Sequence, residues 1–490
     1  MTDVGILAFG AYVPRLRLQR RAMVAANVWF NPGLAAHATG ERAMANWDED
    51  VITMAVEAAR DCLADVPRED VGAIFLASTT HPFADRQNAG VVKEALNLRD
   101  EVGALDVGGS QRAATSTLLN ALHASRGGAG SVLCIASEVS RARPASEAEL
   151  MGGDAAAAVL VGAGQPLARY LGGASTTMDF VDHFRAAGQV HDYAWEGRWV
   201  REEGYGRIAP EAIRSALQKV GLAPADVDRF VMASPLRGAA AAAAKATGIR
   251  KEAVEDPLHA VLGEAGSAQP MVLLASALER AAPHEIIVLA GFGQGCDVLV
   301  FETTAALAAA RSTLGVSGWL ARGREEVNYM KFLAFRGEIE LERGMRSEHD
   351  QKTPLTALYR NRRAVYGLVG GRCRQSGAVQ FPPSPQPLSG PGPLEPFPLA
   401  ESPARVVTHT ADHLTYTPDP PAYYGAIEFA VGARLTTEFT DTDPNEIFVG
   451  APMRMTFRIK AFDERRKFVK YFWKAMVDVR RASAAAVEDQ

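Results

Sequence analysis

The sequence is poor in cysteine, since its 490 residues contain only four and none of these stands at the short spacing of a metal or redox motif. The four are Cys62, Cys134, Cys296 and Cys373. A disulfide-stabilised extracellular domain or a zinc finger needs paired cysteines. The scattered pattern therefore predicts reduced thiols in a cytoplasmic protein.

Long apolar runs and a surplus of positive charge are also missing. No apolar run reaches the roughly 18 residues of a membrane span. The first residues lack the basic region, followed by an apolar one, that opens a secretory signal. The formal net charge of -5 gives no general attraction to nucleic acid. We therefore expect neither a membrane nor a nucleic acid as a partner.

The chain instead carries one unit twice, at a separation of roughly 155 residues. Each copy has the same order of turn, strand and helix signals. The matching segments are 74–78 and 230–234, 109–119 and 266–274, and 132–136 and 286–290. Such a unit is too long for a solenoid repeat and predicts two similar halves around a pseudo-twofold axis. A site between such halves can draw residues from both.

The remaining pattern predicts an α/β protein with an additional β domain. From about residue 5 to 305, short apolar strands alternate with Ala-rich helical stretches, of which residues 50–63 are the clearest helix. A further helical stretch follows, and then eight prolines between Pro382 and Pro398 exclude regular helix or central strand. Residues 405–476 alternate β-prone segments with turns, which is typical of a small antiparallel barrel.

Several segments of the α/β part resemble a known family. These are residues 9–14, the run from Gly40 to Val51, residues 152–157 and residues 320–327. Together they look like the 3-hydroxy-3-methylglutaryl-CoA synthases of the thiolase superfamily, which has the ketoacyl synthase III enzymes as relatives. The resemblance covers about residues 3–340. It implies a duplicated thiolase-fold body of two βαβαβ halves, an acyl-CoA substrate, no bound cofactor and a homodimer.

The C-terminal part resembles a second family, the zinc-ribbon and OB-fold proteins that accompany thiolase-like enzymes. The similarity is carried by residues 370–377, 381–383 and 416–421. A structural zinc needs four ligands, but only Cys373 remains, and Ser376 stands where the second cysteine is expected. We expect a degenerate ribbon without zinc. The implied boundaries are 1–165 for the first half, 166–345 for the second half with a C-terminal helix, 346–400 for the ribbon and Pro-rich loop, and 401–490 for the OB-fold.

The α/β part departs from the synthases where their catalytic groups belong. Gln111 falls at the nucleophilic cysteine, Thr79 at the general-acid glutamate and Ala233 at the catalytic histidine. Glu264 falls at an asparagine that supports catalysis in related condensing enzymes. Because glutamine cannot hold an acyl thioester, an acyl-enzyme on this position is excluded. Ser110 would need an adjacent base to replace it.

Two functional interpretations remain open, together with the family's own activity. The protein is a non-catalytic thiolase-fold partner, or its site is rebuilt for chemistry on a CoA thioester. The rebuilt site would cleave a β-ketoacyl-CoA with water or a β-hydroxyacyl-CoA by a retro-aldol reaction. The third interpretation is that the protein is an acyltransferase or a condensing enzyme of the synthase type. We favour cleavage, because a buried carboxylate at Glu264 is costly to keep without a use.

The candidate catalytic residues are Glu264 as general base, Gln111 as an orienting group, Ser110, and His81 just after the first strand of the repeat. Each also has a structural interpretation, since Gln111 can simply fill a helix start and His81 can face solvent in its turn. Isolated histidines such as His183 are usually structural or exposed, so this residue ranks below the others.

Basic residues are the candidates for binding the phosphates of coenzyme A. Arg237 resembles a basic position near these phosphates in the synthases, and Arg141 and Arg143 are available to assist. Solvated surface charge is the alternative for all three. Cys296 ends a glycine-rich turn and leads almost directly into an apolar strand, so a nucleophilic role for it is disfavoured.

Overall fold

The computed structural model describes residues 3–310, 314–348, 352–388, 390 and 392–478. Pro391 of the Pro-rich loop and residues 479–490 of the expected OB-fold lie outside this part. The chain forms two compact units. The body consists of Met1–Asn46, Asp50–Lys93 and Leu98–Glu338, and the tail unit consists of Trp47–Glu49, Glu94–Asn97 and Ile339–Gln490. Within the described residues, no helix combines the length and the apolar character that crossing a membrane requires.

The body is built on a nine-stranded sheet with the order β11-β12-β13-β8-β1-β7-β6-β4-β5. The strands of the first half are β1 (Val4–Tyr12), β4 (Val71–Ala77), β5 (Gly103–Val107), β6 (Ser131–Val139) and β7 (Asp154–Ala163). Those of the second half are β8 (Ala168–Thr177), β11 (Arg229–Met232), β12 (Ile286–Phe292) and β13 (Gly295–Thr303). Smaller strands are β2 (Leu16–Gln19), β3 (Glu41–Met44), β9 (His183–Phe184), β10 (Tyr193–Ala194) and β14 (Arg324–Glu326).

The strand order confirms the duplication that the sequence predicts. In the first half, β4 pairs in parallel with β6, and β6 pairs antiparallel with β7. In the second half, β11 pairs in parallel with β12, and β12 pairs antiparallel with β13. The two halves join where β1 pairs antiparallel with β8. Beside β11, a parallel bridge between Phe230 and Val254 takes the place that β5 has beside β4.

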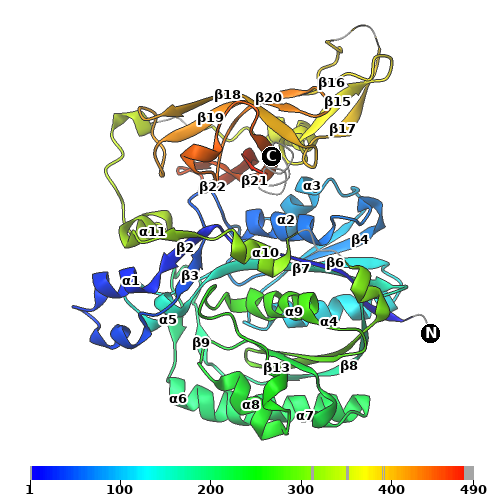
Figure 1. The fold of residues 1–490 in the computed structure, drawn as a ribbon, viewed down its shortest axis with the longest axis vertical. Coiled ribbons are helices and arrows are strands. Elements are labelled where there is room, and N and C mark those ends of the chain that lie inside the picture. The colour runs from blue at the N-terminus through cyan, green and yellow to red at the C-terminus, as the bar shows by residue number, and fades with distance from the viewer. Residues whose placement is uncertain (1–2, 311–313, 349–351, 389, 391, 479–490) are drawn as a thin grey trace, which may run out of the picture. The chain divides into compact units, whose positions relative to one another are not determined.

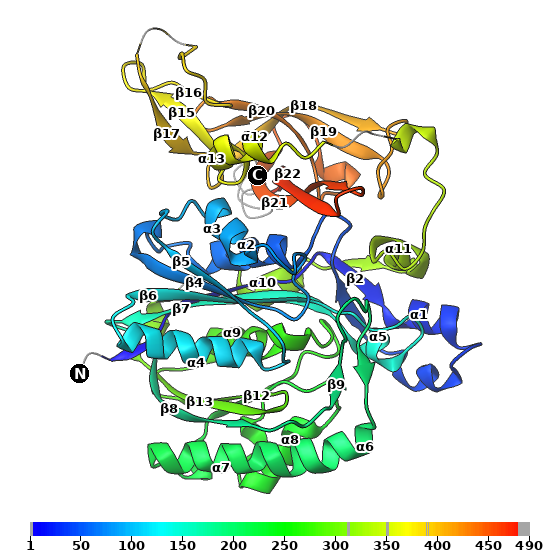
Figure 2. The same cartoon turned by 180° about the vertical axis from the view of Figure 1, so that it is seen from behind.

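Helices fill the space between the two halves and cover their outer faces. In the body, α4 (Ala113–Arg126) and α9 (Gln269–Arg280) lie in the middle layer, between β6 and β7 on one side and β8 and β13 on the other (Figure 1, Figure 2). Residues Gln269 to Leu278 of α9 are all buried, because a helix between two sheets has no solvent face. The outer helices are α2 (Val51–Cys62) on the first half and α7 (Ala209–Val220) and α8 (Ala239–Thr247) on the second.

The remaining helices are short. In the body they are α1 (Arg20–Asn27), α5 (Glu147–Met151), α6 (Gly197–Trp199), α10 (Gly315–Ala321) and α11 (Tyr329–Phe335), with α3 (Asn88–Ala95) reaching the unit boundary. In the tail unit they are α12 (Leu355–Arg360) and α13 (Arg362–Val365).

Two helix predictions have different outcomes. The helix expected over residues 50–63 is confirmed as α2, which Asp50 caps by accepting a hydrogen bond from the Thr53 N–H at 2.9 Å. The helical stretch expected after residue 305 forms as two short helices, α10 and α11, with β14 between them. α10 ends at Ala321, and residues Arg324 to Glu326 then pair in parallel with the free edge of β2.

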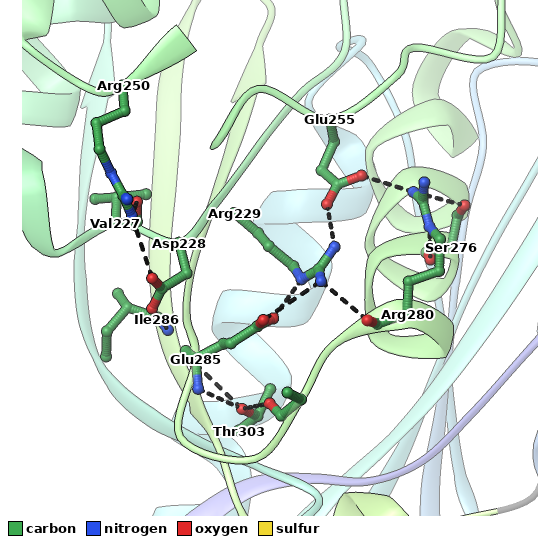
Figure 3. A network of polar contacts seen from close by, with 11 residues as sticks. Val227, Asp228, Arg229, Arg250, Glu255, Ser276, Arg280, Glu285, Ile286 and Thr303 are labelled. Atoms are coloured by element: carbon green, nitrogen blue, oxygen red, sulfur yellow. Dashed lines mark hydrogen bonds and ion pairs between the residues drawn. The ribbon is translucent and has the colours of Figure 1, made fainter. Parts of the chain in front are cut away.

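An ionic network fixes the end of the second half that lies at the start of β11 (Figure 3). Arg229 contacts Glu255 at 2.6 Å and also pairs with Glu285 at the start of β12. Glu255 in turn contacts Arg280, the last residue of α9, at 2.6 Å. The network therefore ties two neighbouring strands to the helix that covers them.

The tail unit contains two antiparallel sheets. The smaller consists of β15 (Val369–Cys373), β16 (Val379–Gln380) and β17 (Leu394–Pro398), and the prolines of β17 lie on an edge strand. The larger consists of β18 (Ala404–Asp412), β19 (Ala422–Phe429), β20 (Arg434–Glu438), β21 (Pro452–Asp463) and β22 (Phe468–Val477) in the order β20-β19-β18-β21-β22. A bridge between Phe439 and Ala475 joins the two ends of this sheet. The additional β region predicted after the α/β part is thereby confirmed.

Candidate active site

The turn before α4 holds the position of the missing thiol. Gln111 lies there between Ser110 and Arg112, directly opposite Gly293 in the turn between β12 and β13. A Cβ at Gly293 would lie 2.8 Å from the Arg112 nitrogen and 3.1 Å from that of Gln111, so only glycine permits this approach. The Ser110 hydroxyl donates to the Gly293 carbonyl at 2.8 Å. The serine therefore holds the turn in place, and in the described part of the chain no base is among the hydrogen-bond partners of its hydroxyl.

A buried ion pair fixes the start of α4 to the second half. Arg112 Nη1 lies 2.7 Å from Asp297 Oδ1, and the side chain of Asp297 is 1% exposed. Asp297 also accepts hydrogen bonds from Ser175 at 2.5 Å and from Thr115 at 3.2 Å. Because the carboxylate is fully surrounded by donors, its burial is compensated. The position of Gln111 is set by this anchor.

A second buried carboxylate, Glu138 at the carboxyl end of β6, lies at the centre of the cluster. It accepts hydrogen bonds from the Thr79 N–H at 2.9 Å and the Thr79 hydroxyl at 3.1 Å, and from the hydroxyls of Thr80 and Ser267. Thr79, which stands where the family has its glutamate, therefore binds a carboxylate supplied by the neighbouring strand. Glu138 is not among the residues predicted from the sequence, although a charged residue at the end of a buried apolar strand was a usable signal.

Glu264 reaches the cluster from the loop before α9. Its Oε2 accepts the N–H of Gly266 at 3.0 Å. Burial raises the pKa of Glu264 to about 7, the Gly266 hydrogen bond opposes this shift, and the charge of Glu138 adds to it. A Cβ at Gly266 would lie 2.9 Å from Glu138 Cγ and 3.2 Å from Gln111 Oε1. Gly266 therefore packs directly against both side chains and lets the three polar groups meet.

His183 on β9 completes the cluster. Its Nε2 lies 3.1 Å from Gln111 Nε2, and its Nδ1 lies 3.2 Å from Asp182 Oδ1. Burial lowers the pKa of His183, but the hydrogen bond and charge of Asp182 outweigh it, so the net shift is upward. Sequence reasoning ranked this histidine low, because nothing in the pattern placed the loop after β8 beside the start of α4.

The other candidate residues lie around this cluster. Burial lowers the pKa of His81, and its Nε2 has no hydrogen-bond partner among the described residues. The charges of Asp106 and Glu138 oppose this shift. The Cys296 thiol is buried, and burial raises its pKa.

The three basic candidates are not brought to one point. Arg237 is exposed, with its Nη2 3.8 Å from Met151 Sδ. Arg141 is partly buried and lines a small pocket with Arg42 and Arg336, while Arg143 is exposed. Within the described residues, no three His, Cys, Asp or Glu side chains are grouped so that they could hold a metal ion.

The arrangement of layers and the helix start opposite a glycine turn define a body of the thiolase-like condensing-enzyme fold. A 3-oxoacyl-(acyl carrier protein) synthase III, FabH, from Pseudomonas aeruginosa PAO1 is similar, with a TM-score of 0.56 and 21% identity over 62% of this chain and 98% of that one. The structure of MvaS in complex with 3-hydroxy-3-methylglutaryl coenzyme A is also similar. Its TM-score is 0.58 and its identity 19%, over 68% of this chain and 92% of that one. The model of the 3-oxoacyl-[acyl-carrier-protein] synthase III C-terminal domain matches residues 217–300.

Relatives by sequence identify the family to which this chain belongs within the thiolase-like fold. The hydroxymethylglutaryl-CoA synthase of Archaeoglobus fulgidus is 30% identical over 316 residues, which are 62% of this chain and 90% of the relative. The hydroxymethylglutaryl-CoA synthase of Pyrococcus horikoshii is 30% identical over 307 residues, which are 61% of this chain and 86% of the relative. The chain belongs to the hydroxymethylglutaryl-CoA synthase family. The resemblance of the body is thus confirmed, while the zinc-ribbon and OB-fold resemblance of the tail unit stays a prediction.

Proposed function

We propose that the body carries out carbon–carbon bond chemistry on an acyl-CoA thioester without an acyl-enzyme, and that the reaction is cleavage. The observation that carries the proposal is the exchange of groups at the site. An amide, Gln111, stands where the family has its thiol, while Glu264 has a pKa of about 7 in the same cluster. Near neutral pH such a carboxylate accepts and returns protons readily.

The two cleavage reactions share one proton acceptor. In a retro-aldol reaction Glu264 takes the proton of the β-hydroxyl, the O–H electron pair forms the carbonyl, and the Cα–Cβ pair passes into the thioester as an enolate. With a β-ketoacyl-CoA, Glu264 takes a proton from water, whose oxygen adds to the β-carbonyl before the same bond breaks. The enolate then receives a proton at Cα, which gives the shorter acyl-CoA. The positive end of the α4 dipole, at the position of Gln111, favours the enolate oxygen.

The remaining assignments follow from the same proposal. Arg237, Arg141 and Arg143 supply positive charge for the phosphates of the coenzyme, and Gln111 orients the thioester or a water molecule. The strand order of the larger tail sheet and its closing bridge are those of a five-stranded Greek-key barrel. This supports an OB-fold in the tail unit, with β15–β17 as the degenerate ribbon.

Incubation with a panel of β-ketoacyl-CoA and β-hydroxyacyl-CoA thioesters, followed by mass spectrometry, tests the proposal. We expect release of a shorter acyl-CoA by the wild type and none by Glu264→Gln, which keeps the shape and loses the proton acceptor. Gln111→Ala should slow the reaction by about tenfold to a hundredfold. Iodoacetamide should leave activity intact, since the Cys296 thiol is buried and burial raises its pKa. Glu302→Gln on β13 is the control.

The outcomes separate the alternatives. Full activity of Glu264→Gln, or inactivation by iodoacetamide that substrate prevents, would reject the assignment. Formation of a longer acyl-CoA from two shorter ones would favour the condensing reaction that the names of the relatives suggest. No turnover of any panel member, with coenzyme A binding retained, would favour a non-catalytic partner of an active homologue.

A further inference from the structure

The histidine nearest to the missing thiol is arranged for proton transfer. Asp182 contacts one ring nitrogen of His183 at 3.2 Å, and the other ring nitrogen points at the Gln111 amide at 3.1 Å. A carboxylate beside one ring nitrogen stabilises the imidazolium, while the other nitrogen faces the position of the missing thiol, so the ring is placed to transfer a proton there. The side chain of His183 is 25% exposed, so a substrate can reach it.

We propose that His183, oriented by Asp182, is a catalytic residue of this site, which donates the proton that the enolate takes up at Cα. The inference rests on the proposed function, since it adds the acid to the base already assigned. In the step, the Nε2–H bond of the imidazolium breaks, its electrons stay on the ring, and a Cα–H bond forms from the enolate pair. Glu264 and His183 then exchange protons with solvent to restore the starting state.

The Gln111 amide supports a protonated His183. As placed, its Nε2 faces the imidazole and its buried Oε1 has no hydrogen-bond partner among the described residues. Oxygen and nitrogen of an amide are interchangeable in such a fit. Rotation by 180° would let Oε1 accept a hydrogen bond from the imidazolium and turn the NH₂ group toward the side where Glu138 lies.

The charges around His183 favour its protonated form. Asp182 precedes it in the chain, Asp192 directly precedes β10, and Glu264 belongs to the loop before α9. The charges of all three raise the pKa of His183. Arg185 pairs with Asp192 at 2.5 Å and reduces that contribution. The buried Tyr205 also faces this group of carboxylates, and burial raises its pKa, so it stays neutral. The rate of cleavage should therefore be bell-shaped, because the reaction needs Glu264 ionised and His183 protonated.

Exchange of the Cα hydrogens of acetyl-CoA and propionyl-CoA in D₂O, followed by mass spectrometry, tests the inference. We expect the wild type to exchange these hydrogens, and His183→Asn to do so at least about a hundredfold more slowly. Asp182→Asn should lose about tenfold. Because the neutral imidazole removes the Cα proton in this exchange, the variant should also move the lower pH limb of exchange to lower pH. His191→Gln is the matched control, because His191 also contacts a carboxylate, Glu338, at 2.8 Å. It should exchange at the wild-type rate.

The assay separates the two proposals. Exchange that depends on His183, without cleavage of any panel thioester, would support the histidine assignment and reject cleavage. Exchange by His183→Asn at the wild-type rate with an unchanged pH profile, or no exchange by the wild type, would overturn the assignment. If His183→Asn fails to fold by circular dichroism, the pH profile of Asp182→Asn decides, and an unmoved lower limb of exchange would reject the proposal.

Discussion

At the scale of single residues, the site shows how one substitution changes the chemistry available to a fold. A neutral asparagine amide can be buried with its hydrogen bonds satisfied. Burial of an ionised carboxylate in the same place costs free energy and therefore favours the protonated form. Glu264 therefore has a pKa of about 7. This value suits proton transfer, but the ionised carboxylate destabilises the folded state. A group kept at such a cost is more consistent with use than with neutral drift.

We expect the destabilisation caused by ionised Glu264 to appear in the pH dependence of the free energy of unfolding. Because the pKa of Glu264 is raised in the folded state, the folded protein binds the proton more tightly, and stability is lost as pH rises from about 4.5 to about 7. Glu264→Gln should therefore raise the free energy of unfolding by about 3 kcal/mol at pH 8 and by under about 1 kcal/mol at pH 5. Urea unfolding at both pH values measures this, and an equal effect at both would contradict it.

At the scale of elements, the site depends on how the start of α4 is held. Gln111 has no regular secondary structure of its own, and its place follows from Arg112, whose guanidinium pairs with Asp297 on β13. Glu138 similarly joins the end of β6 to the end of β4 and to the turn Gly266–Ala268 before α9. Carboxylates that bridge elements thus hold the strand ends and helix starts of the site together.

Removing the anchor of α4 should be costly. Asp297→Asn leaves the Arg112 guanidinium without its counter-charge in a largely buried place, so the free energy of unfolding should fall by about 3 kcal/mol. Glu302→Gln on the same strand removes a partner of Arg169 at a far more exposed position and should cost under about 1 kcal/mol. Chemical denaturation of both variants gives the comparison. Similar losses for the two would show that burial of the first pair has no consequence.

At the scale of the whole molecule, the sheet of the body ends in an open edge. β5 is the terminal strand, and its Leu105 is 47% exposed. An edge strand with an apolar side chain is a liability in a monomer unless another strand covers it. Thiolase-like bodies resembling this one pair through such an edge, so we expect at least a homodimer.

Light scattering tests the oligomeric state. The wild type should give a mass of at least twice 52.4 kDa at micromolar concentration. Leu105→Lys should shift the equilibrium toward the monomer, because it places a charge on the strand that is expected to pair. Leu388→Lys, at an exposed position in the Pro-rich loop of the tail unit, is the control. A wild-type monomer at all micromolar concentrations would contradict the prediction.

The sequence by itself determined the large-scale plan of this protein. The repeated strand and helix signals predicted the two halves, because hydrophobic periodicity reports directly which faces are buried. The loss of the thiol at Gln111 and the gain of Glu264 were also visible, since each is a matter of residue type at a matched position. The three-residue strand β14 was not, because pairing with a free edge of β2 overrode the local helix preference.

Only the tertiary structure decided which polar groups meet. Glu138, Asp182 and His183 come from strands and loops that no local pattern connects to the start of α4, and they face it because two half-sheets enclose the same pair of central helices. The pKa of Glu264 is likewise a property of its burial and of its neighbours. Proton transfer depends on separations of about 3 Å, and distances of that size between remote segments arise only once the whole body is folded.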